Sequence, residues 1–355
     1  MGKREVEWLK QNKIIPIAQQ HVECYKKILV NCLRLTNQKV LILGDYGFEG
    51  KRISPIISSA YYLAARDLGM DANLIFEHPK TKGEVAELEI ITALEGLGEG
   101  NAVIMNMTNR MGSLRGISKS FRAFAREREH RFISTSSLEL PTSYLKYFIA
   151  STDIDYIALQ ETGQRIKEAL DDGNEVHCTT EAGTDLYYDI KGHEAVSADG
   201  RYGGPGMGGN LPSGEVYVPC RGKRVNGRIV IDGSTRNRFS TIVIGKNPIT
   251  LDIEDGKVVN IEGGEEAKLL EASYEWAEKR AKYPWGIRRV GEFGIGINPK
   301  AELIGSMVLD EKVIGTAHIA TGSNYWFGGS IYAIIHLDQV FKNPKIFIDD
   351  NEITV

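Results

Sequence analysis

The hydrophobic pattern of roughly the first 150 residues alternates between helical spacing and short continuous apolar runs. Apolar residues three or four apart predict a helix over residues 17–35, and the run over 39–43, ended by Gly44 and Asp45, predicts a buried strand. The same patterns predict further elements in alternation: helices over 54–68 and 118–129, and strands over 72–76, 102–107 and 132–134. Strands that alternate with helices form βαβ units, so we expect a mostly parallel sheet.

The pattern changes after about residue 185, where short strands separated by turn residues take over. These strands are expected over 215–219, 228–232, 241–244, 249–253 and 257–261, and one amphipathic helix over 265–282. The chain therefore predicts two domains: an α/β domain over 1–185, and a β-rich, antiparallel α+β domain over 186–355 that binds metal and carries the catalytic site.

Composition narrows the class of protein. The 355 residues carry a net charge of −4 without clustered Lys and Arg, which argues against a nucleic-acid surface. No run of 18 apolar residues and no apolar leader occurs, so we expect no membrane span or secretion signal. The four cysteines form no Cys-x-x-Cys pair, which disfavours a thiolate zinc site. A cytoplasmic location with reduced thiols is expected.

Six residues in the second half have the side chains of a two-metal centre: Glu215, Glu292, Glu311, His318, His336 and Asp338. Carboxylates and imidazoles of this number are what two divalent ions about 3.5–4 Å apart require, with at least one carboxylate bridging. Mixed nitrogen and oxygen ligands suit Zn, Co or Mn.

Each of these residues also has an ordinary interpretation. His336 and Asp338 would share one face of a strand and bind one ion, or form a hydrogen-bonded surface pair. His318, in an apolar small-residue context, would also suit a hydrogen-bonded core histidine. Glu311 stands in an Asp-Glu-Lys turn of a kind that is usually solvated. Glu215 and Glu292 each follow a glycine and precede an apolar residue, where a buried carboxylate needs a cation or a donor.

Other site motifs are missing from the sequence. The first βα turn does not read G-x-G-x-x-G, and neither a phosphate-binding loop nor a G-x-S-x-G elbow occurs. The loop around Asp45–Gly50 follows a predicted strand and would form a ligand site or, as the simpler interpretation, a packing turn.

Four segments of the second half together resemble the aminopeptidase T (AmpS-type) metallo-aminopeptidases: 210–217, 291–298, 315–322 and 336–338. Over residues 1–200 the likeness is architectural only. The resemblance implies a cytoplasmic homodimer that hydrolyses peptide or amide substrates with two divalent ions. It implies Glu215, Glu292, His318, His336 and Asp338 as metal ligands, with Glu292 bridging. It also implies Tyr325 as an active-site tyrosine. Glu311 resembles the family's acidic residue upstream of the histidine, and the stretch between Glu311 and His318 is about two residues longer here than in the family.

The mechanism implied by the resemblance is hydrolysis by a metal-activated water. Two ions lower the pKa of a bridging water, and Glu311 or Glu292 transfers its proton to the leaving amine. Tyr325 would donate a hydrogen bond to the tetrahedral oxyanion.

Alternative functions stay open at this point. Ring-cleaving dihydroxypyridine dioxygenases resemble the C-terminal half of the same family, and the resemblance implies one Fe(II) held by two His and an Asp. Their His falls at the position of Glu292, so Glu292 together with Glu215 favours the two-ion hydrolase. A hydrolase of a specialised amide, and a non-catalytic module whose acidic residues are surface groups, are the remaining alternatives. The number of ions per chain separates hydrolase from dioxygenase.

Overall fold

The chain folds into two compact units. The computed structural model describes residues 3–220 and 224–355. One unit holds the chain up to Tyr156 together with Gly200–Ser213, and the other holds Ile157–Asp199 together with Gly214–Val355. The domain boundary expected after residue 185 stays a prediction.

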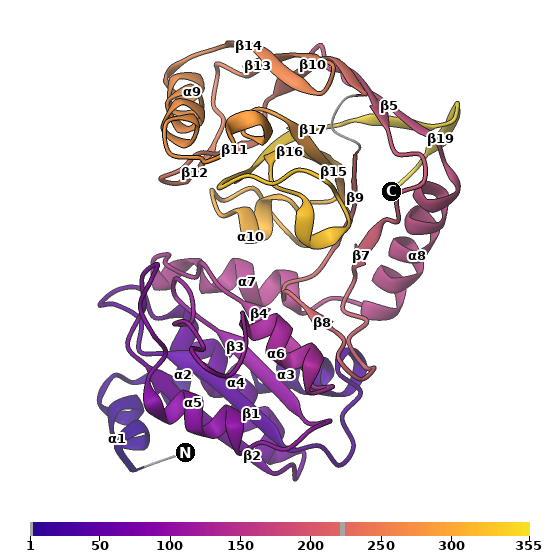
Figure 1. Cartoon of the computed structure of the whole chain (residues 1–355). Coiled ribbons are helices and arrows are strands. Elements are labelled where there is room, and N and C mark those ends of the chain that lie inside the picture. Colours follow the sequence, from indigo (N-terminus) through magenta and orange to yellow (C-terminus); the bar gives the residue numbers. More distant parts are fainter. Residues whose placement is uncertain (1–2, 221–223) are drawn as a thin grey trace. The chain divides into compact units, whose positions relative to one another are not determined.

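The first unit is built on a parallel sheet with strand order β2-β1-β3-β4-β8 (Figure 1). Its strands are β1 (Val40–Asp45), β2 (Ala72–Glu77), β3 (Ala102–Asn106), β4 (Arg131–Thr135) and β8 (Gly208–Gly209). Its helices are α1 (Lys3–Gln11), α2 (Ile14–Gln19), α3 (Val22–Lys27), η1 (Ile28–Cys32), α4 (Ile53–Asp67), α5 (Leu88–Glu95), α6 (Phe121–Glu127), η2 (Thr142–Tyr144) and α7 (Leu145–Thr152).

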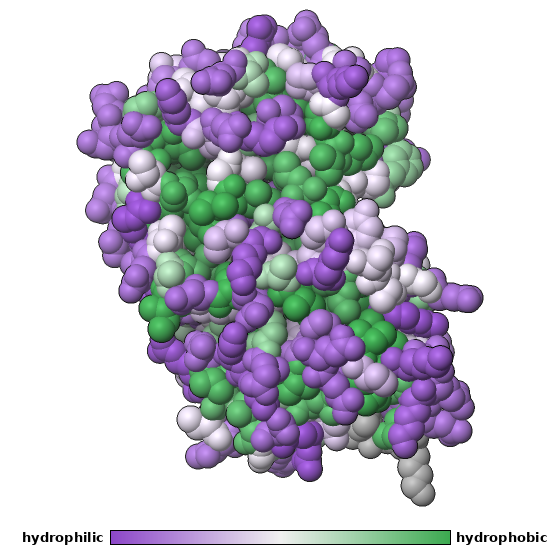
Figure 2. All heavy atoms as spheres, turned by 180° about the vertical axis from the view of Figure 1, so that it is seen from behind, coloured by the Kyte–Doolittle hydropathy of each residue, from purple (hydrophilic) through white to green (hydrophobic). Residues whose placement is uncertain are grey.

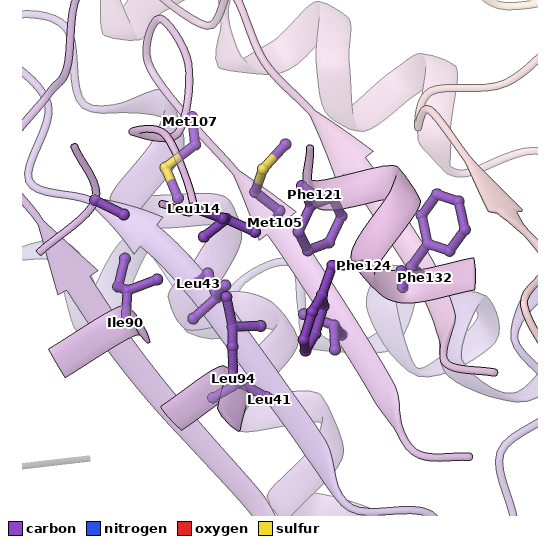
Figure 3. Packing of buried hydrophobic residues seen from close by; sticks show 13 residues of the cluster. Leu41, Leu43, Ile90, Leu94, Met105, Met107, Leu114, Phe121, Phe124 and Phe132 are labelled. Atoms are coloured by element: carbon purple, nitrogen blue, oxygen red, sulfur yellow. The ribbon is translucent and has the colours of Figure 1, made fainter. Parts of the chain in front are cut away.

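Apolar residues of β1 and β3 form the core of this unit. Leu41 and Leu43 of β1 point to the face on which Ile90 and Leu94 of α5 and Phe124 of α6 pack (Figure 3). Alternate residues of a strand point to opposite faces, so the remaining residues of β1 face the other way. Helix α4 also packs on β1, β2 and β3. Burial on both sides explains why β1 is apolar almost throughout.

The prediction of one continuous helix over 17–35 is wrong, although most of the stretch is helical. Three shorter segments, α2, α3 and η1, occupy this stretch, and α2 ends at Gln19 before α3 begins at Val22. Gln20 and His21 interrupt the apolar pattern, and both α2 and α3 pack against α4. The break lets two short helices contact one long one.

Asp45, at the carboxyl end of β1, is fully buried and ties two strands together. Its carboxylate accepts hydrogen bonds from the backbone N–H of Gly47 at 3.0 Å, and from the backbone N–H and hydroxyl of Thr108 at 2.6 and 2.5 Å. These bonds favour the packing interpretation of the 45–50 loop.

The second unit contains two antiparallel sheets. One has the order β14-β13-β10-β6-β5-β18-β19, and the other has the order β12-β11-β17-β16-β15-β9-β7. Strands of the first are β5 (Glu175–Thr179), β6 (Asp185–Asp189), β10 (Val225–Ile231), β13 (Ile249–Glu254), β14 (Lys257–Glu262), β18 (Lys345–Ile348) and β19 (Asn351–Ile353). Strands of the second are β7 (Val196–Ala198), β9 (Glu215–Pro219), β11 (Ser234–Arg236), β12 (Thr241–Val243), β15 (Val290–Gly296), β16 (Thr316–Gly322) and β17 (His336–Lys342). Its helical elements are α8 (Tyr156–Asp172), which begins at the last residue of the first unit, α9 (Glu265–Glu278), η3 (Pro284–Gly286), α10 (Met307–Asp310) and η4 (Tyr325–Phe327).

The expected fold class, an α/β part with a parallel sheet followed by an antiparallel β-rich part, is confirmed. Strands β15 and β16 lie in the middle of the second antiparallel sheet and are buried along their whole length. Phe293 of β15 packs against Tyr188 of β6, with ring centroids 5.6 Å apart, and so joins the two antiparallel sheets. The opposite face of β15 carries Glu292 and is left for polar groups.

The surface mixes polar and apolar side chains, as Figure 2 shows for one side of the molecule. Exposed apolar residues include Tyr325, Trp326 and Tyr332 of the second unit. Within residues 3–220 and 224–355, no helix combines the length and the apolar character needed to cross a bilayer.

Candidate metal centre

Four neighbouring strands bring the candidate ligands to one face of the sheet. Glu292 of β15 pairs with Ala320 of β16, and Ala320 pairs with Asp338 of β17. The same registers place His318 opposite Gly294, His336 opposite Gly322, and Glu215 opposite Gly296. Each of these side chains therefore has a glycine or an alanine as a cross-strand neighbour on one side, although His318 also pairs with Val340 and Glu292 with Pro219. The small neighbours leave room for the large polar groups to converge.

Glu292, His336 and Asp338 form the tightest group. They are the one set of three candidate ligands, among the residues that the structure describes, whose ligand atoms all lie within 4.8 Å of one another. Nε2 of His336 lies 3.1 Å from Oδ1 of Asp338 and 3.5 Å from Oε2 of Glu292. Nδ1 of His336 donates to the carbonyl oxygen of Ser323 at 2.9 Å, because a carbonyl can only accept. This bond fixes the ring and leaves Nε2 as the nitrogen that can bind a metal ion.

His318 lies beside this group. Its Nε2 is 3.3 Å from Oε1 of Glu292 and 3.8 Å from Oε2 of Glu215. The ring is fully buried, and its Nδ1 has no hydrogen-bond partner. The structure thus connects His318 to the three-residue group through Glu292.

Glu215 and Glu311 are held by a lysine. Lys312 is fully buried, and its ammonium lies 3.1 Å from Oε1 of Glu215 and also contacts Oε1 of Glu311. Burial acts to lower the pKa of Lys312, but the two carboxylates outweigh it and raise that pKa above its usual range. The two carboxylates therefore favour the charged form of Lys312 inside the site.

The charges shift the pKa values of the ligands in opposite directions. Burial alone would lower the pKa of both histidines, but Glu292 raises that of His318 to about 9 and Asp338 raises that of His336 to about 10. Burial acts to raise the pKa of Asp338, yet the neighbouring His336 lowers it to about 2. Burial raises the pKa of Glu292. A metal ion would have to displace protons from these imidazoles.

Aromatic rings surround His336. The ring centroids of Trp326 and Phe327 lie 4.9 and 6.4 Å from that of His336, and Phe327 meets Tyr217 edge-on at 5.2 Å. Trp326 is 55% exposed, so a flat surface stands open to solvent beside the metal group.

The structure does not bring all the site residues predicted from the sequence into one group. Glu292, His336 and Asp338 converge, His318 contacts Glu292, and Glu215 and Glu311 bind Lys312. Tyr325 is 62% exposed and its ring packs on Tyr332, so its catalytic role stays a prediction. The sequence analysis missed Lys312, whose position between Leu309 and Val313 is the only local sign that it is buried.

The converged donors suit a divalent ion. Two carboxylates and one imidazole carry enough negative charge to bind Fe(II), Mn(II) or Zn(II), and the oxygen-rich set favours the harder ions. All three side chains are largely buried, where uncompensated carboxylates are costly. Fold and site together are those expected of a metal-dependent enzyme, with the three candidate ligands on strands of the β-rich unit.

Comparison with known proteins identifies the family. The profile of the NicX family, 2,5-dihydroxypyridine 5,6-dioxygenase, matches residues 149–355, more than half of the chain. The chain belongs to this dioxygenase family. Membership in this dioxygenase family implies a metal cofactor.

Individual relatives agree with the family. A curated 2,5-dihydroxypyridine 5,6-dioxygenase of Pseudomonas putida is 26% identical over 196 residues, which span 52% of this chain and 54% of the relative. The match therefore covers about half the length of that protein. A solved structure of the dihydroxypyridine dioxygenase from Pseudomonas putida has a TM-score of 0.72 at 20% identity, over 95% of this chain and 96% of that one. A structure of AmpT from Thermus thermophilus has a TM-score of 0.63 at 16% identity, over 95% and 98%. At these identities the two structures show the fold alone.

The family match corrects the sequence-based identification. The assignment to the aminopeptidase T family is wrong, and with it the expected metallo-aminopeptidase function and the hydrolase and protease class. AmpT is a more distant relative of the fold. The error has a physical reason: Glu, His and Asp on neighbouring strands define a metal centre, and such a centre does not by itself specify the reaction.

Proposed function

We propose that this chain is a dioxygenase that opens a dihydroxylated, nitrogen-containing aromatic ring, with one metal ion held by Glu292, His336 and Asp338. The family match over residues 149–355, which includes all three ligands, carries this proposal. The proposed substrate is a small aromatic molecule close to 2,5-dihydroxypyridine, the compound in the name of the Pseudomonas putida relative.

The reaction consumes one O2 per ring. The bond between two ring carbons breaks, both oxygen atoms enter the ring-opened product, and no external reductant is needed. When bound, a redox-active ion such as Fe(II) supplies the one-electron chemistry that lets O2 react with the ring. The chain's own residues hold the ion, exclude competing ligands and position the substrate.

The donor set differs from the usual one. Non-haem Fe(II) oxygenases typically use two histidines and one carboxylate, whereas His336 is the only imidazole in the converged group here. His318 provides a second imidazole next to Glu292. We propose Fe(II) or Mn(II) as the ion, because both accept oxygen-rich sites.

The aromatic rings next to His336 suit a planar substrate. Trp326 and Phe327 offer flat apolar contact beside the metal group, and aromatic side chains of this kind pair favourably with other aromatic rings.

Other expectations stay predictions. These are the ligand roles of Glu215 and His318, the catalytic roles of Glu292, Glu311 and Tyr325, the homodimer and the cytoplasmic location. The expected two-ion centre with Zn, Co or Mn is the alternative to the single ion that we propose.

Oxygen uptake tests the proposal. The protein is loaded with Fe(II) without air, and O2 consumption is followed after 2,5-dihydroxypyridine is added. We expect uptake that His336→Ala abolishes and that His177→Ala leaves unchanged, since His177 pairs with Asp185 on the other antiparallel sheet. An iron-loaded protein that consumes no O2 with this ring or with isomeric dihydroxypyridines contradicts the proposal.

A further inference from the structure

We propose that Lys312 acts as a built-in cation that takes the place of a second metal ion, so that the centre holds one ion per chain. This inference rests on the proposed single-ion function and explains how a site with four carboxylates, three of them buried, remains mononuclear.

The first support is the placement of the lysine. Lys312 is buried to 0% exposure, and its ammonium contacts one carboxylate oxygen from Glu215 and one from Glu311. A lysine is almost never fully buried unless it is paired, and here both partners belong to the site. Oxygens that a second ion would need are therefore already bound by a cation.

The second support is that the backbone of Lys312 is anchored beside the site. Its backbone N–H donates to the carbonyl of Leu309 at 2.9 Å, and its carbonyl accepts from the N–H of Asn298 at 2.8 Å. The neighbouring Gly296 approaches so closely that a Cβ there would lie 2.8 Å from the carbonyl carbon of Lys312. The backbone at this point is fixed against β15, and the ammonium itself is held by burial and by its two ion pairs with Glu215 and Glu311.

The third support is the arrangement of the remaining donors. Glu215, Glu311 and His318 comprise two carboxylates and one imidazole, the same types as in the converged group. His318 lies 3.3 Å from Glu292, which contacts His336 at 3.5 Å, so Glu292 stands between the two sets. The ligand atoms of this second set do not all lie within 4.8 Å of one another, as those of the converged group do. Once the lysine charge is removed, a second ion would draw them together, with Glu292 as the shared ligand. With the lysine, like charges repel a second divalent ion.

The consequence is a specific change in stoichiometry. Lys312→Met keeps the length of the side chain but removes its charge, and it is expected to convert the one-ion centre into a two-ion centre. Lys312→Arg keeps the charge and is expected to bind one ion. Lys342→Met removes a partly exposed lysine that lies 3.8 Å from Asp232 on the same sheet, and it serves as the matched control.

The experiment uses Mn(II) alone and no turnover. Full-length protein is stripped of metal and titrated with Mn(II), the bound ions are counted by calorimetry and elemental analysis, and electron paramagnetic resonance is recorded. We expect one bound Mn(II) with an isolated-ion spectrum in the wild type, in Lys312→Arg and in Lys342→Met. Lys312→Met is expected to take up two, whose spectrum shows spin coupling because ions that share a bridge lie about 4 Å apart.

Two results overturn the inference: two coupled Mn(II) ions in the wild type, or a folded Lys312→Met protein that binds one ion like the wild type. If Lys312→Met does not fold, Glu311→Gln decides. Its Mn(II) affinity is expected to stay within about 100-fold of wild type, the upper end of the loss for residues outside the ligand shell, whereas a larger loss makes Glu311 a ligand and overturns the inference. Because turnover is not measured, the inference and the proposed ring cleavage can fail separately.

Discussion

His318 of β16 and Gly294 of β15 lie directly opposite each other, and the imidazole fills the space that a side chain at residue 294 would take. A Cβ placed on Gly294 would be 2.2 Å from Nε2 of His318, the atom that faces Glu292. The position of this histidine therefore depends on the absence of a side chain across the strand.

Gly294→Ala is expected to displace the imidazole of His318 and loosen its contact with Glu292. Because both strands are buried, the added methyl group is expected to lower the free energy of unfolding by about 1–3 kcal/mol. Chemical denaturation and Mn(II) titration would measure the losses of stability and metal affinity. Gly245→Ala is the control, since nothing lies within 4 Å of a Cβ there. Equal stability and equal metal affinity of the two variants would contradict this account.

Asp338→Asn is expected to reduce metal binding far more than it reduces stability. The change removes a charged oxygen donor from the group whose ligand atoms lie within 4.8 Å of one another, and keeps the size of the side chain. Replacing a metal ligand should lower the metal affinity by more than the roughly 10–100-fold found when residues outside the ligand shell are replaced. Elemental analysis after equilibration with Fe(II) or Mn(II) measures it. Asp255→Asn, in the turn between β13 and β14, should retain wild-type metal content; a fully loaded Asp338→Asn protein would remove Asp338 from the ligand set.

Glu77→Gln tests a pH dependence in the first unit. Burial raises the pKa of Glu77 from 4.5 to about 7, although the backbone N–H groups of Glu87 and Gly112 donate to its carboxylate. The folded protein therefore holds this proton more tightly than the unfolded chain, so the contribution of Glu77 to stability is full below about pH 4.5 and falls as the pH rises to about 7. Gln is uncharged, like the protonated carboxyl group, so Glu77→Gln is expected to lack this loss of stability at higher pH. Calorimetry from pH 4.5 to 7.5 should show the melting temperature of wild type falling relative to that of Glu77→Gln, and parallel curves would refute the assignment.

Trp326→Leu tests the aromatic surface beside His336. Loss of the indole, whose ring lies 4.9 Å from that of His336, is expected to raise KM for the ring substrate by about tenfold with a smaller change in kcat, because one aromatic contact contributes about 0.5–1.5 kcal/mol beyond its buried area. Steady-state oxygen uptake separates the two constants. Trp285→Leu removes an indole that packs on Arg289 and is the control. An unchanged KM in Trp326→Leu would place the substrate elsewhere.

Local pattern predicted much of the fold. The strand expected over 215–219 is β9, and the alternation before residue 150 gave the parallel sheet. Helix α8 was not among the predicted elements. Gly163 stands in its middle, where a Cβ would lie 2.5 Å from the hydroxyl of Ser197. That contact joins residues far apart in sequence.

Only the part of the site that depends on local spacing could be predicted from the sequence. His336 and Asp338 share a strand face, so their convergence follows from a spacing of two residues. The role of Lys312 depends on how β9 and β15 pair, because that register brings Glu215 next to it. Registers between distant strands are not visible in local spacing, so an Asp-Glu-Lys turn looked solvated although its lysine is buried.

Labelling with ¹⁸O2 tests the central claim most directly. The iron-loaded protein is allowed to react with a dihydroxypyridine under ¹⁸O2, and the ring-opened product is analysed by mass spectrometry. The account predicts that both oxygen atoms of one O2 appear in the product and that Asp338→Asn forms none. A product without ¹⁸O, or a fully loaded protein that leaves the ring intact, would contradict it.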